Sequence, residues 1–162
     1  MTPAIKKILY ENDLSEQTRT SLSWAMTLAR KHDAQLLMLN VIEDIFSSVS
    51  LQVHFSEREW KDLKQRFDNE AKGMMQKRLE AFCEEVKNET PQCTYVADEI
   101  LVRRGNAVEK IIDTAEKQDC DIIVMGTHGT GGLRDSLMGS TARRVLRRSK
   151  IPVFVVPVRP AR

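Results

Sequence analysis

The segment at residues 35–42 constrains the fold more than any other part of the chain. It reads QLLMLNVI, an apolar run of strand length with a single polar residue in its interior. A strand with one wet face alternates polar and apolar residues, whereas a strand that is covered on both faces is apolar almost throughout. Such strands belong to parallel sheets with helices on both sides. We therefore expect residues 35–42 to form a strand near the centre of an α/β sheet.

Four further segments have the length and apolar character of strands. Pro152 lies at the start of the last of them, where a missing backbone N–H is tolerated better than it is inside a strand. The four segments are residues 5–10, 94–103, 122–125 and 151–156.

Between these strands, apolar residues recur every three or four positions, which predicts amphipathic helices. Ser15 is a candidate cap for the first helix, and Ser56 and Glu59 form a capping-box signature at the start of the second. Gly73 weakens the second helix by about 1 kcal/mol relative to alanine and could bend it. The expected helices cover about residues 16–32, 56–86, 106–115 and 140–148.

Five strands that alternate with four helices predict a parallel sheet, covered on both faces, with right-handed crossovers. With 162 residues and no linker, repeat or low-complexity tract, residues 1–162 are expected to form one domain. In such sheets ligands bind beyond the carboxyl ends of the strands, at the point where the strand order reverses. Functional residues are therefore expected in the loops that follow strands.

Composition excludes several classes of protein. The longest apolar runs are far shorter than the ~20 residues of a membrane span, and the N-terminal segment lacks the features of a signal peptide, so we expect a cytoplasmic protein. Three scattered histidines give no metal-ligand spacing. Three cysteines without C-x-x-C spacing argue against a disulfide framework and against a zinc site. These cysteines are Cys83, Cys93 and Cys120.

A glycine-rich loop follows the strand at residues 122–125. Five of the seven glycines of the chain lie within residues 126–139. Their backbone N–H groups can converge on an anion, and the helix that begins near Gly139 adds free N–H groups and the positive end of its dipole. Ser140 and Thr141 supply hydroxyl donors, and Ser140 could also cap the helix. The alternative is a tight turn without a ligand, and glycine content alone does not distinguish the two.

Two familiar phosphate-binding motifs do not fit this loop. A P-loop requires a lysine before Ser140, and the dinucleotide fingerprint belongs in the first strand-to-helix turn, whereas this loop follows the fourth strand.

The spacing Gly126-x-x-Gly129, nine residues, then Gly139-Ser140 resembles the ATP-binding signature of the universal stress protein family, and it matches at all four positions. The likeness extends along the chain, through residues 7–13, 40–41, 105–109, 121–126 and 151–157. The resemblance implies a single-domain Rossmann-like (adenine nucleotide alpha hydrolase-like) three-layer sandwich. Its five-stranded parallel sheet would have the order 3-2-1-4-5.

The resemblance also implies a ligand, an adenine nucleotide across the carboxyl edge of the sheet. ATP is expected, with AMP or ADP as alternatives, and Mg²⁺ would accompany the phosphates. Carried over by position, Asp13 would contact the ribose or adenosine end, Val41 would line the adenine slot, Met125 and Gly126 would flank the nucleotide, Gly129 and Gly139 would approach the phosphates, and Ser140 and Thr141 would donate to them.

The chain departs from the family pattern around this aspartate. Family members commonly have proline two residues before it and glycine just after it, where this chain has Glu11 and Leu14. The larger Leu14 is expected to restrict the turn after Asp13.

Two other functions remain open. Arg134 and Asp135 lie in the spacer of the signature, where an arginine could reach terminal phosphates, so an ATPase or phosphotransferase is one alternative. No acidic or amide residue is placed to orient a water, which favours a regulatory nucleotide binder with at most slow hydrolysis. A nucleotide-free module for protein interaction is the other alternative.

The C-terminal part of the chain suggests partners. The basic residues at positions 143–150 complement the dipole of the last helix better than they indicate nucleic-acid binding, because aromatic residues are missing from the run. The apolar strand Val153, Phe154, Val155 and Val156 invites pairing with a second copy. The family resemblance likewise implies a homodimer through this last strand, and an unidentified protein partner would read the nucleotide state.

Overall fold

Parallel strands and helices alternate throughout the described chain. The computed structural model describes residues 2–15, 18–43, 54–90, 96–127 and 138–157. The elements are β1 (Lys7–Glu11), α1 (Thr18–His32), β2 (Gln35–Ile42), α3 (Glu57–Glu89), β3 (Glu99–Arg104), α4 (Ala107–Lys117), β4 (Ile122–Gly126), α5 (Ser140–Arg148) and β5 (Val153–Val156).

The five strands form one parallel sheet in the order β3-β2-β1-β4-β5, which confirms the expected topology. β2 pairs with the central strand β1, and its residues 36–40 are all buried, as its apolar run predicts. The chain proceeds from β1 toward one edge and from β4 toward the other. The strand order therefore reverses between β1 and β4, which are neighbours.

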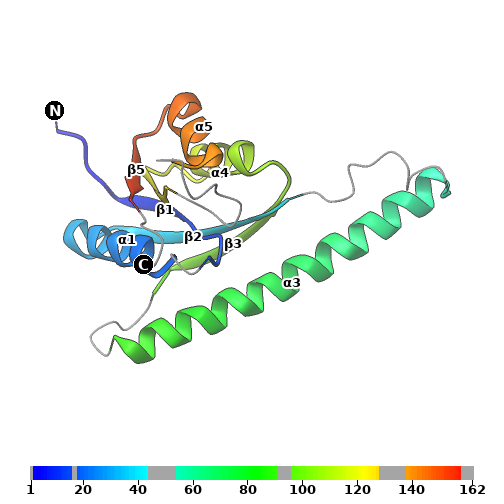
Figure 1. Cartoon of the computed structure of the whole chain (residues 1–162), viewed down its shortest axis with the longest axis horizontal. Helices are drawn as coiled ribbons and strands as arrows, with labels where there is room; N and C mark the ends of the chain where they lie inside the picture. The colour runs from blue at the N-terminus through cyan, green and yellow to red at the C-terminus, as the bar shows by residue number, and fades with distance from the viewer. Residues whose placement is uncertain (1, 16–17, 44–53, 91–95, 128–137, 158–162) are drawn as a thin grey trace.

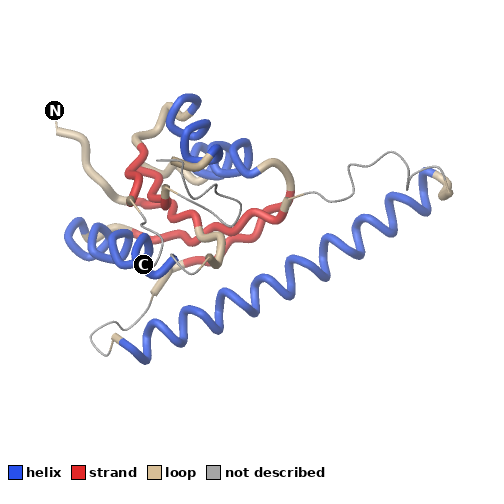
Figure 2. Tube along the Cα trace, viewed as in Figure 1, coloured by secondary structure: helices blue, strands red, loops and turns tan. Residues whose placement is uncertain are grey.

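Helices cover both faces of the sheet (Figures 1 and 2). Tyr10 and Met38 belong to a core with α1 and α3, whereas Leu9 and Leu39 belong to a second core with α4 and α5. Successive residues of one strand thus enter different cores, because side chains of a strand alternate between its faces. This arrangement explains why β1 and β2 are apolar without alternation.

Several predicted strand boundaries shift. β1 begins at Lys7 rather than residue 5 and ends at Glu11. β3 begins at Glu99, because the Asp98 carboxylate accepts the Leu36 N–H at 2.7 Å and takes the place of a ladder bond. β5 begins at Val153, because Ser149 Oγ accepts the Ile151 N–H and donates to the Ile151 carbonyl, which turns the chain just before the strand.

The capping box at the start of α3 is confirmed. Ser56 Oγ accepts the Glu59 N–H, and the Glu59 carboxylate accepts the Ser56 N–H at 2.9 Å. The helix then continues through Gly73 without a break (Figure 1). A Cβ at Gly73 would meet nothing within 4 Å, so packing within the subunit does not require a glycine there.

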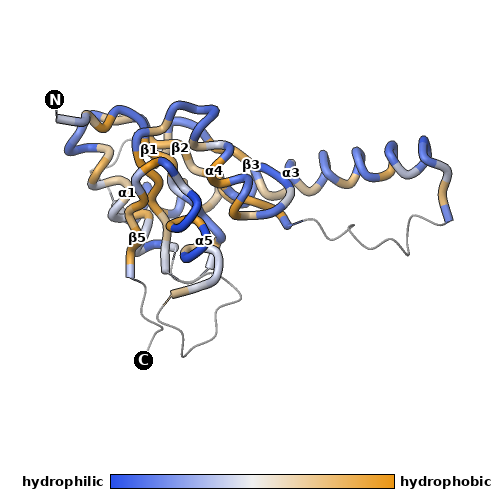
Figure 3. The backbone as a smooth tube through the Cα atoms, turned by 90° about the horizontal axis from the view of Figure 1, so that it is seen from above, coloured by the Kyte–Doolittle hydropathy of each residue, from blue (hydrophilic) through white to orange (hydrophobic). Residues whose placement is uncertain are grey.

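α3 is longer than the sheet that it covers. Its 33 residues span about 50 Å, at about 1.5 Å per residue. The longest strand has only 8 residues, so the N-terminal part of α3 projects beyond the sheet (Figure 3). Leu79 and Val86 are buried, but Phe67 and Met74 are 45% and 64% exposed. The apolar stripe was correctly predicted to be helical, and only its C-terminal part lies in the core.

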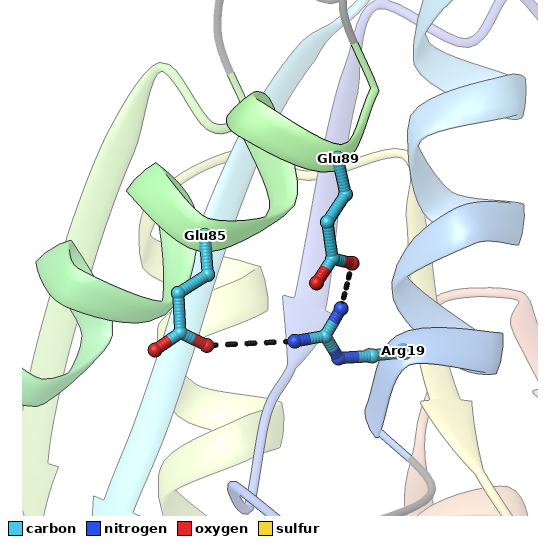
Figure 4. Close-up of polar contacts among 3 residues, drawn as sticks. All are labelled: Arg19, Glu85 and Glu89. Atoms are coloured by element: carbon cyan, nitrogen blue, oxygen red, sulfur yellow. Dashed lines mark hydrogen bonds and ion pairs between the residues drawn. The ribbon is translucent and has the colours of Figure 1, made fainter.

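Two ion-pair contacts hold α3 against the rest of the molecule. Arg104, at the end of β3, contacts Asp68 at 2.8 Å, and their side chains are only 7% and 26% exposed. Near the other end of α3, Arg19 of α1 pairs with Glu85 and Glu89 (Figure 4). The Arg19 and Glu85 side chains are about half-exposed or more, so water screens the second contact far more than the first.

We expect Asp68→Ala to lower the free energy of unfolding by about 1 to 3 kcal/mol, because it removes a carboxylate that pairs with Arg104 where water screens the pair only weakly. Glu85→Ala is the matched control on the same helix, and we expect a loss below about 1 kcal/mol from this exposed pair. Urea unfolding of the three proteins measures both values. Equal losses in the two variants would contradict the distinction.

Within the described chain, no helix combines the length and the apolarity needed to cross a membrane.

Candidate functional site

The candidate site lies at the carboxyl edge of the sheet, around the point where the strand order reverses. Asp13 follows β1, Val41 lies at the end of β2, Gly126 ends β4, and Gly139 precedes α5. Parallel strands present their carboxyl ends to the same edge, so residues that are far apart in the sequence meet there. Met125, Ser140 and Thr141 belong to the same group of elements. Gly129, Arg134 and Asp135 lie outside the described residues.

The start of α5 differs from the prediction in one respect. Ser140 is the first residue of the helix and not its cap, because Gly139 occupies the cap position without a side-chain hydrogen bond. The Gly139 N–H donates to the Thr127 carbonyl at 2.6 Å, and this bond joins the start of α5 to the end of β4. The backbone of Gly139 has φ −64° and ψ 158°, an extended conformation that any residue adopts.

The amides at the start of α5 therefore have different roles. The Gly139 N–H is already bonded within the protein and is not a donor for a ligand. The first-turn amides of residues 140–142 have no partner within the helix, and they coincide with the positive end of its dipole. Ser140 is exposed and Thr141 partly exposed, so this helix end is accessible from solvent.

Asp13 helps to shape the turn that follows β1. Its Oδ1 accepts the Ser15 N–H at 2.9 Å and the Thr18 hydroxyl at 3.1 Å. Leu14 has φ 57°, the left-handed conformation that glycine adopts without penalty and leucine adopts at a cost of about 1 kcal/mol. The Asn12 side chain stabilises the turn, because its Oδ1 accepts the Leu14 N–H at 2.8 Å. The turn thus forms with leucine in place of glycine.

Two asparagines at this edge were not identified from the sequence. Asn40 Nδ2 donates to the Asn12 carbonyl at 2.7 Å, and both residues are buried. Asn40 Oδ1 is buried and accepts no hydrogen bond from the described residues, which is costly for a buried acceptor. The signal was present in the sequence, because Asn40 is the polar residue that interrupts the apolar run at residues 35–42.

Glu11, at the end of β1, has a strongly shifted acidity. Burial by the surrounding protein and, to a lesser extent, the negative charge of Asp13 together raise the pKa of its carboxyl group from the ordinary value to about 8. Glu11 is therefore largely protonated at neutral pH. Although this edge carries two carboxyl groups, it is less negative than its composition suggests.

Val41 and Met125 both pack toward α4 and α5. Met125 is only 2% exposed, so its side chain belongs to the core and only its backbone can flank a ligand. Val41 is partly exposed at the end of its strand and offers an apolar surface.

Other reactive groups form no site in the described part of the chain. No three histidine, cysteine or acidic side chains there are grouped so that they could hold a metal ion. Cys83 and Cys120 are free, and burial raises the pKa of both thiols to about 11, so they are neutral at physiological pH. Cys93 lies outside the described residues.

Comparison with known proteins agrees with this arrangement. The model of the universal stress protein family matches residues 4–157. The chain belongs to the universal stress protein family. A similar member is universal stress protein MJ0577 of Methanocaldococcus jannaschii, 29% identical over 96% of this chain and 97% of its own length.

Solved structures of universal stress proteins share the fold. The MJ0577 structure superimposes with a TM-score of 0.69 at 28% identity and covers 98% of this chain and 100% of that one. UspA from Lactobacillus plantarum gives a TM-score of 0.70 at 23% identity and covers 96% and 99% of the two chains. A universal stress protein solved in complex with cAMP gives 0.58 at 18% identity, with 96% and 98% covered. The last two likenesses concern the fold alone.

We expect Glu11→Gln to stabilise the protein at neutral and alkaline pH. Glutamine imitates the protonated carboxyl group, so the variant and the wild type should be equally dependent on pH below the unfolded pKa. Between that pKa and about 8 the unfolded wild type ionises while the folded one stays protonated, so wild-type stability is progressively lost. The difference in the free energy of unfolding between the variant and the wild type should therefore grow in favour of the variant as the pH rises. Above pH 8 this difference should exceed its value at acid pH by at least about 1 kcal/mol.

Urea unfolding of both proteins between pH 4.5 and 9 measures this difference, and other titrating groups cancel in the comparison. A difference that stays constant across the range would show that the pKa of Glu11 is not raised by folding.

Proposed function

We propose that this universal stress protein is a regulatory ATP binder, with at most slow hydrolysis. The adenine nucleotide lies across the carboxyl edge of the sheet, ATP being the expected ligand and AMP or ADP the alternatives. The observation that carries the proposal is the start of α5, where a glycine occupies the cap position beside the end of β4.

The backbone of Gly139 does not require glycine. Its φ and ψ are open to every residue, and serine or aspartate there would add a capping bond that glycine lacks. The missing side chain instead leaves room for a phosphate oxygen to approach the free amides of residues 140–142. The hydroxyl groups of Ser140 and Thr141 add donors. The family signature adds Gly129 to the proposed phosphate site.

The adenosine end of the ligand meets the ends of β1 and β2. Val41 supplies an apolar surface for the adenine ring, and Met125 and Gly126 flank the nucleotide through their backbone. Asp13 uses Oδ1 within its own turn, so Oδ2 is the atom that accepts a ribose hydroxyl. Small-molecule sites of this kind combine an apolar lining with few polar groups. A structural relative that binds cAMP, also an adenine nucleotide, is consistent with the proposal.

Mg²⁺ enters this site with the phosphates. The ion retains several waters and is commonly bound by one or two carboxylates together with substrate phosphates. Neither carboxyl group at this edge is assigned to the ion, because Asp13 accepts the ribose hydroxyl in this proposal and Glu11 is largely protonated at neutral pH, so the phosphates and water would hold the ion. The ion supplies charge neutralisation when it is bound.

Saturating MgATP should raise the melting temperature by roughly 5 to 10 °C, since ligand at 100 times its Kd adds about 2.7 kcal/mol and a chain of this size shifts by about 2 to 4 °C per kcal/mol. Gly139→Val should abolish most of the shift, because its side chain blocks the approach of phosphate. Gly73→Val is the matched control: a Cβ there meets nothing, and the shift should persist. Differential scanning fluorimetry measures all three proteins.

Other outcomes would favour the alternatives. An undiminished shift in Gly139→Val would place the ligand elsewhere. Turnover of about 1 per second or more, abolished by Arg134→Ala or Asp135→Ala, would indicate an enzyme. If ATP changes neither the melting temperature of the wild type nor its hydrogen exchange at residues 126–139, the protein is a nucleotide-free interaction module.

The output of this binder is regulatory. Nucleotide occupancy alters a surface that a protein partner reads. The protein acts in the cytoplasm as a single domain, residues 1–162, and as a homodimer through Val153, Phe154, Val155 and Val156. These residues form the edge strand β5, and the first three are partly exposed.

A further inference from the structure

The helix α5 carries four arginines, and its dipole accounts for only two of them. Arg143, Arg144, Arg147 and Arg148 are all exposed, and none of them forms an ion pair or a side-chain hydrogen bond with another described residue. Arg147 and Arg148 lie in the last turn, where the negative end of the dipole stabilises cations. Arg143 and Arg144 lie nearer the positive end and gain nothing from it. A bound anion would stabilise a cation at this end of the helix.

Arg144 is the arginine that adjoins both hydroxyl groups at the start of α5. It follows Ser140 by four residues and Thr141 by three, and residues at these spacings are neighbours on the surface of a helix. Helical side chains also lean toward the N-terminus. The backbone of Arg144 lies about 6 Å along the axis from that of Ser140, a distance that an arginine side chain spans. Its guanidinium therefore reaches the level of the free amides of residues 140–142.

The side of α5 that carries Arg144 faces the candidate site. Ala142 and Val145 are buried against the sheet. At 3.6 residues per turn, Thr141 and Arg144 fall on one side of this buried face and Leu146 falls on the other. A right-handed crossover from β4 through α5 to β5 directs the first side toward β4 and α4, which lies on the same face of the sheet (Figure 1). Leu146 is 41% exposed, as its place beside the open edge of β5 requires.

We propose that Arg144 contacts the terminal phosphates of the bound nucleotide and thereby distinguishes ATP and ADP from AMP. This inference rests on the proposed function, which places the phosphates at the start of α5. It adds a residue from outside the glycine signature, and it gives a physical reason for a preference among adenine nucleotides.

The order of the strands determines which phosphates lie beside Arg144. In the proposed complex the adenosine end meets the ends of β1 and β2, whereas α5 follows β4. β2 and β4 flank β1, so they are two strand spacings, or about 10 Å, apart. The phosphates farthest from the adenosine are therefore the ones that reach α5. The single phosphate of AMP is attached to the ribose and stays nearer to β1.

A guanidinium group suits these phosphates. Its planar fork of N–H donors matches two phosphate oxygens, and its charge is permanent. The amides of residues 140–142 and the two hydroxyl groups are neutral donors, so Arg144 brings the positive charge to this cluster. A bound phosphate would also offset the repulsion between Arg144 and Arg148, which are like charges four residues apart.

Isothermal titration calorimetry with MgATP and with AMP tests the contact in the full-length protein. Arg144→Gln should weaken the binding of MgATP about tenfold or more, because it removes a charge-assisted hydrogen bond. The affinity for AMP should change by less than about twofold, as expected for an exposed charge that the ligand does not touch. Arg144→Lys keeps the charge without the planar fork and should restore part of the affinity for MgATP.

Arg148→Gln is the matched control. It removes the same charge from the same side of the helix, about 6 Å farther from the phosphates. Both affinities should stay within about twofold of the wild type.

The outcomes separate this inference from the function on which it rests. Equal losses of MgATP affinity in Arg144→Gln and Arg148→Gln would indicate a general effect of surface charge and overturn the contact. Equal losses for MgATP and AMP in Arg144→Gln would overturn the assignment to terminal phosphates. An unchanged MgATP affinity in Arg144→Gln would overturn the inference while the proposed function stands. A wild type that binds neither nucleotide would overturn both.

Discussion

Burial of both faces of one parallel sheet is the constraint on which the rest of this structure depends. Residues of β1 and β2 enter two cores in alternation, so helices must cover both sides of the sheet. Each parallel pair of strands then needs a crossover, and all strands end at the same edge. The candidate site is a consequence of this geometry, because it gathers the residues that follow β1, β2 and β4.

At the carboxyl edge, the apolar packing of the sheet is replaced by a small network of hydrogen bonds. Asn40 holds the Asn12 carbonyl, Asn12 holds the turn at Leu14, and the Thr127 carbonyl holds the start of α5. Each of these bonds fixes a backbone segment and none belongs to the regular sheet ladder. A ligand bound at this edge, as proposed, would meet a backbone that these bonds already hold in place, which reduces the cost of ordering on binding.

The sheet ends at two very different edges. Beside β3, α3 is anchored through the partly buried pair of Arg104 and Asp68, and its excess length carries an apolar stripe past the sheet. Beside β5, no described strand covers the outward groups of Val153 and Val155. The two edges thus differ in what they leave open: a helix surface at one and unpaired backbone at the other.

Local patterns predicted the fold class, the order of elements and the capping box at Ser56, because periodicity and capping depend on residues close in the sequence. The glycine spacing typical of the family pointed to the carboxyl edge of the sheet, where the structure places the described residues of that prediction, and their contact with a nucleotide stays a prediction. Only the tertiary structure assigned the cap of α5 to Gly139, the raised pKa to Glu11 and the exposed positions to Phe67 and Met74. Each of these properties depends on which distant parts of the chain pack against the residue. The neighbouring residues in the sequence do not determine those contacts.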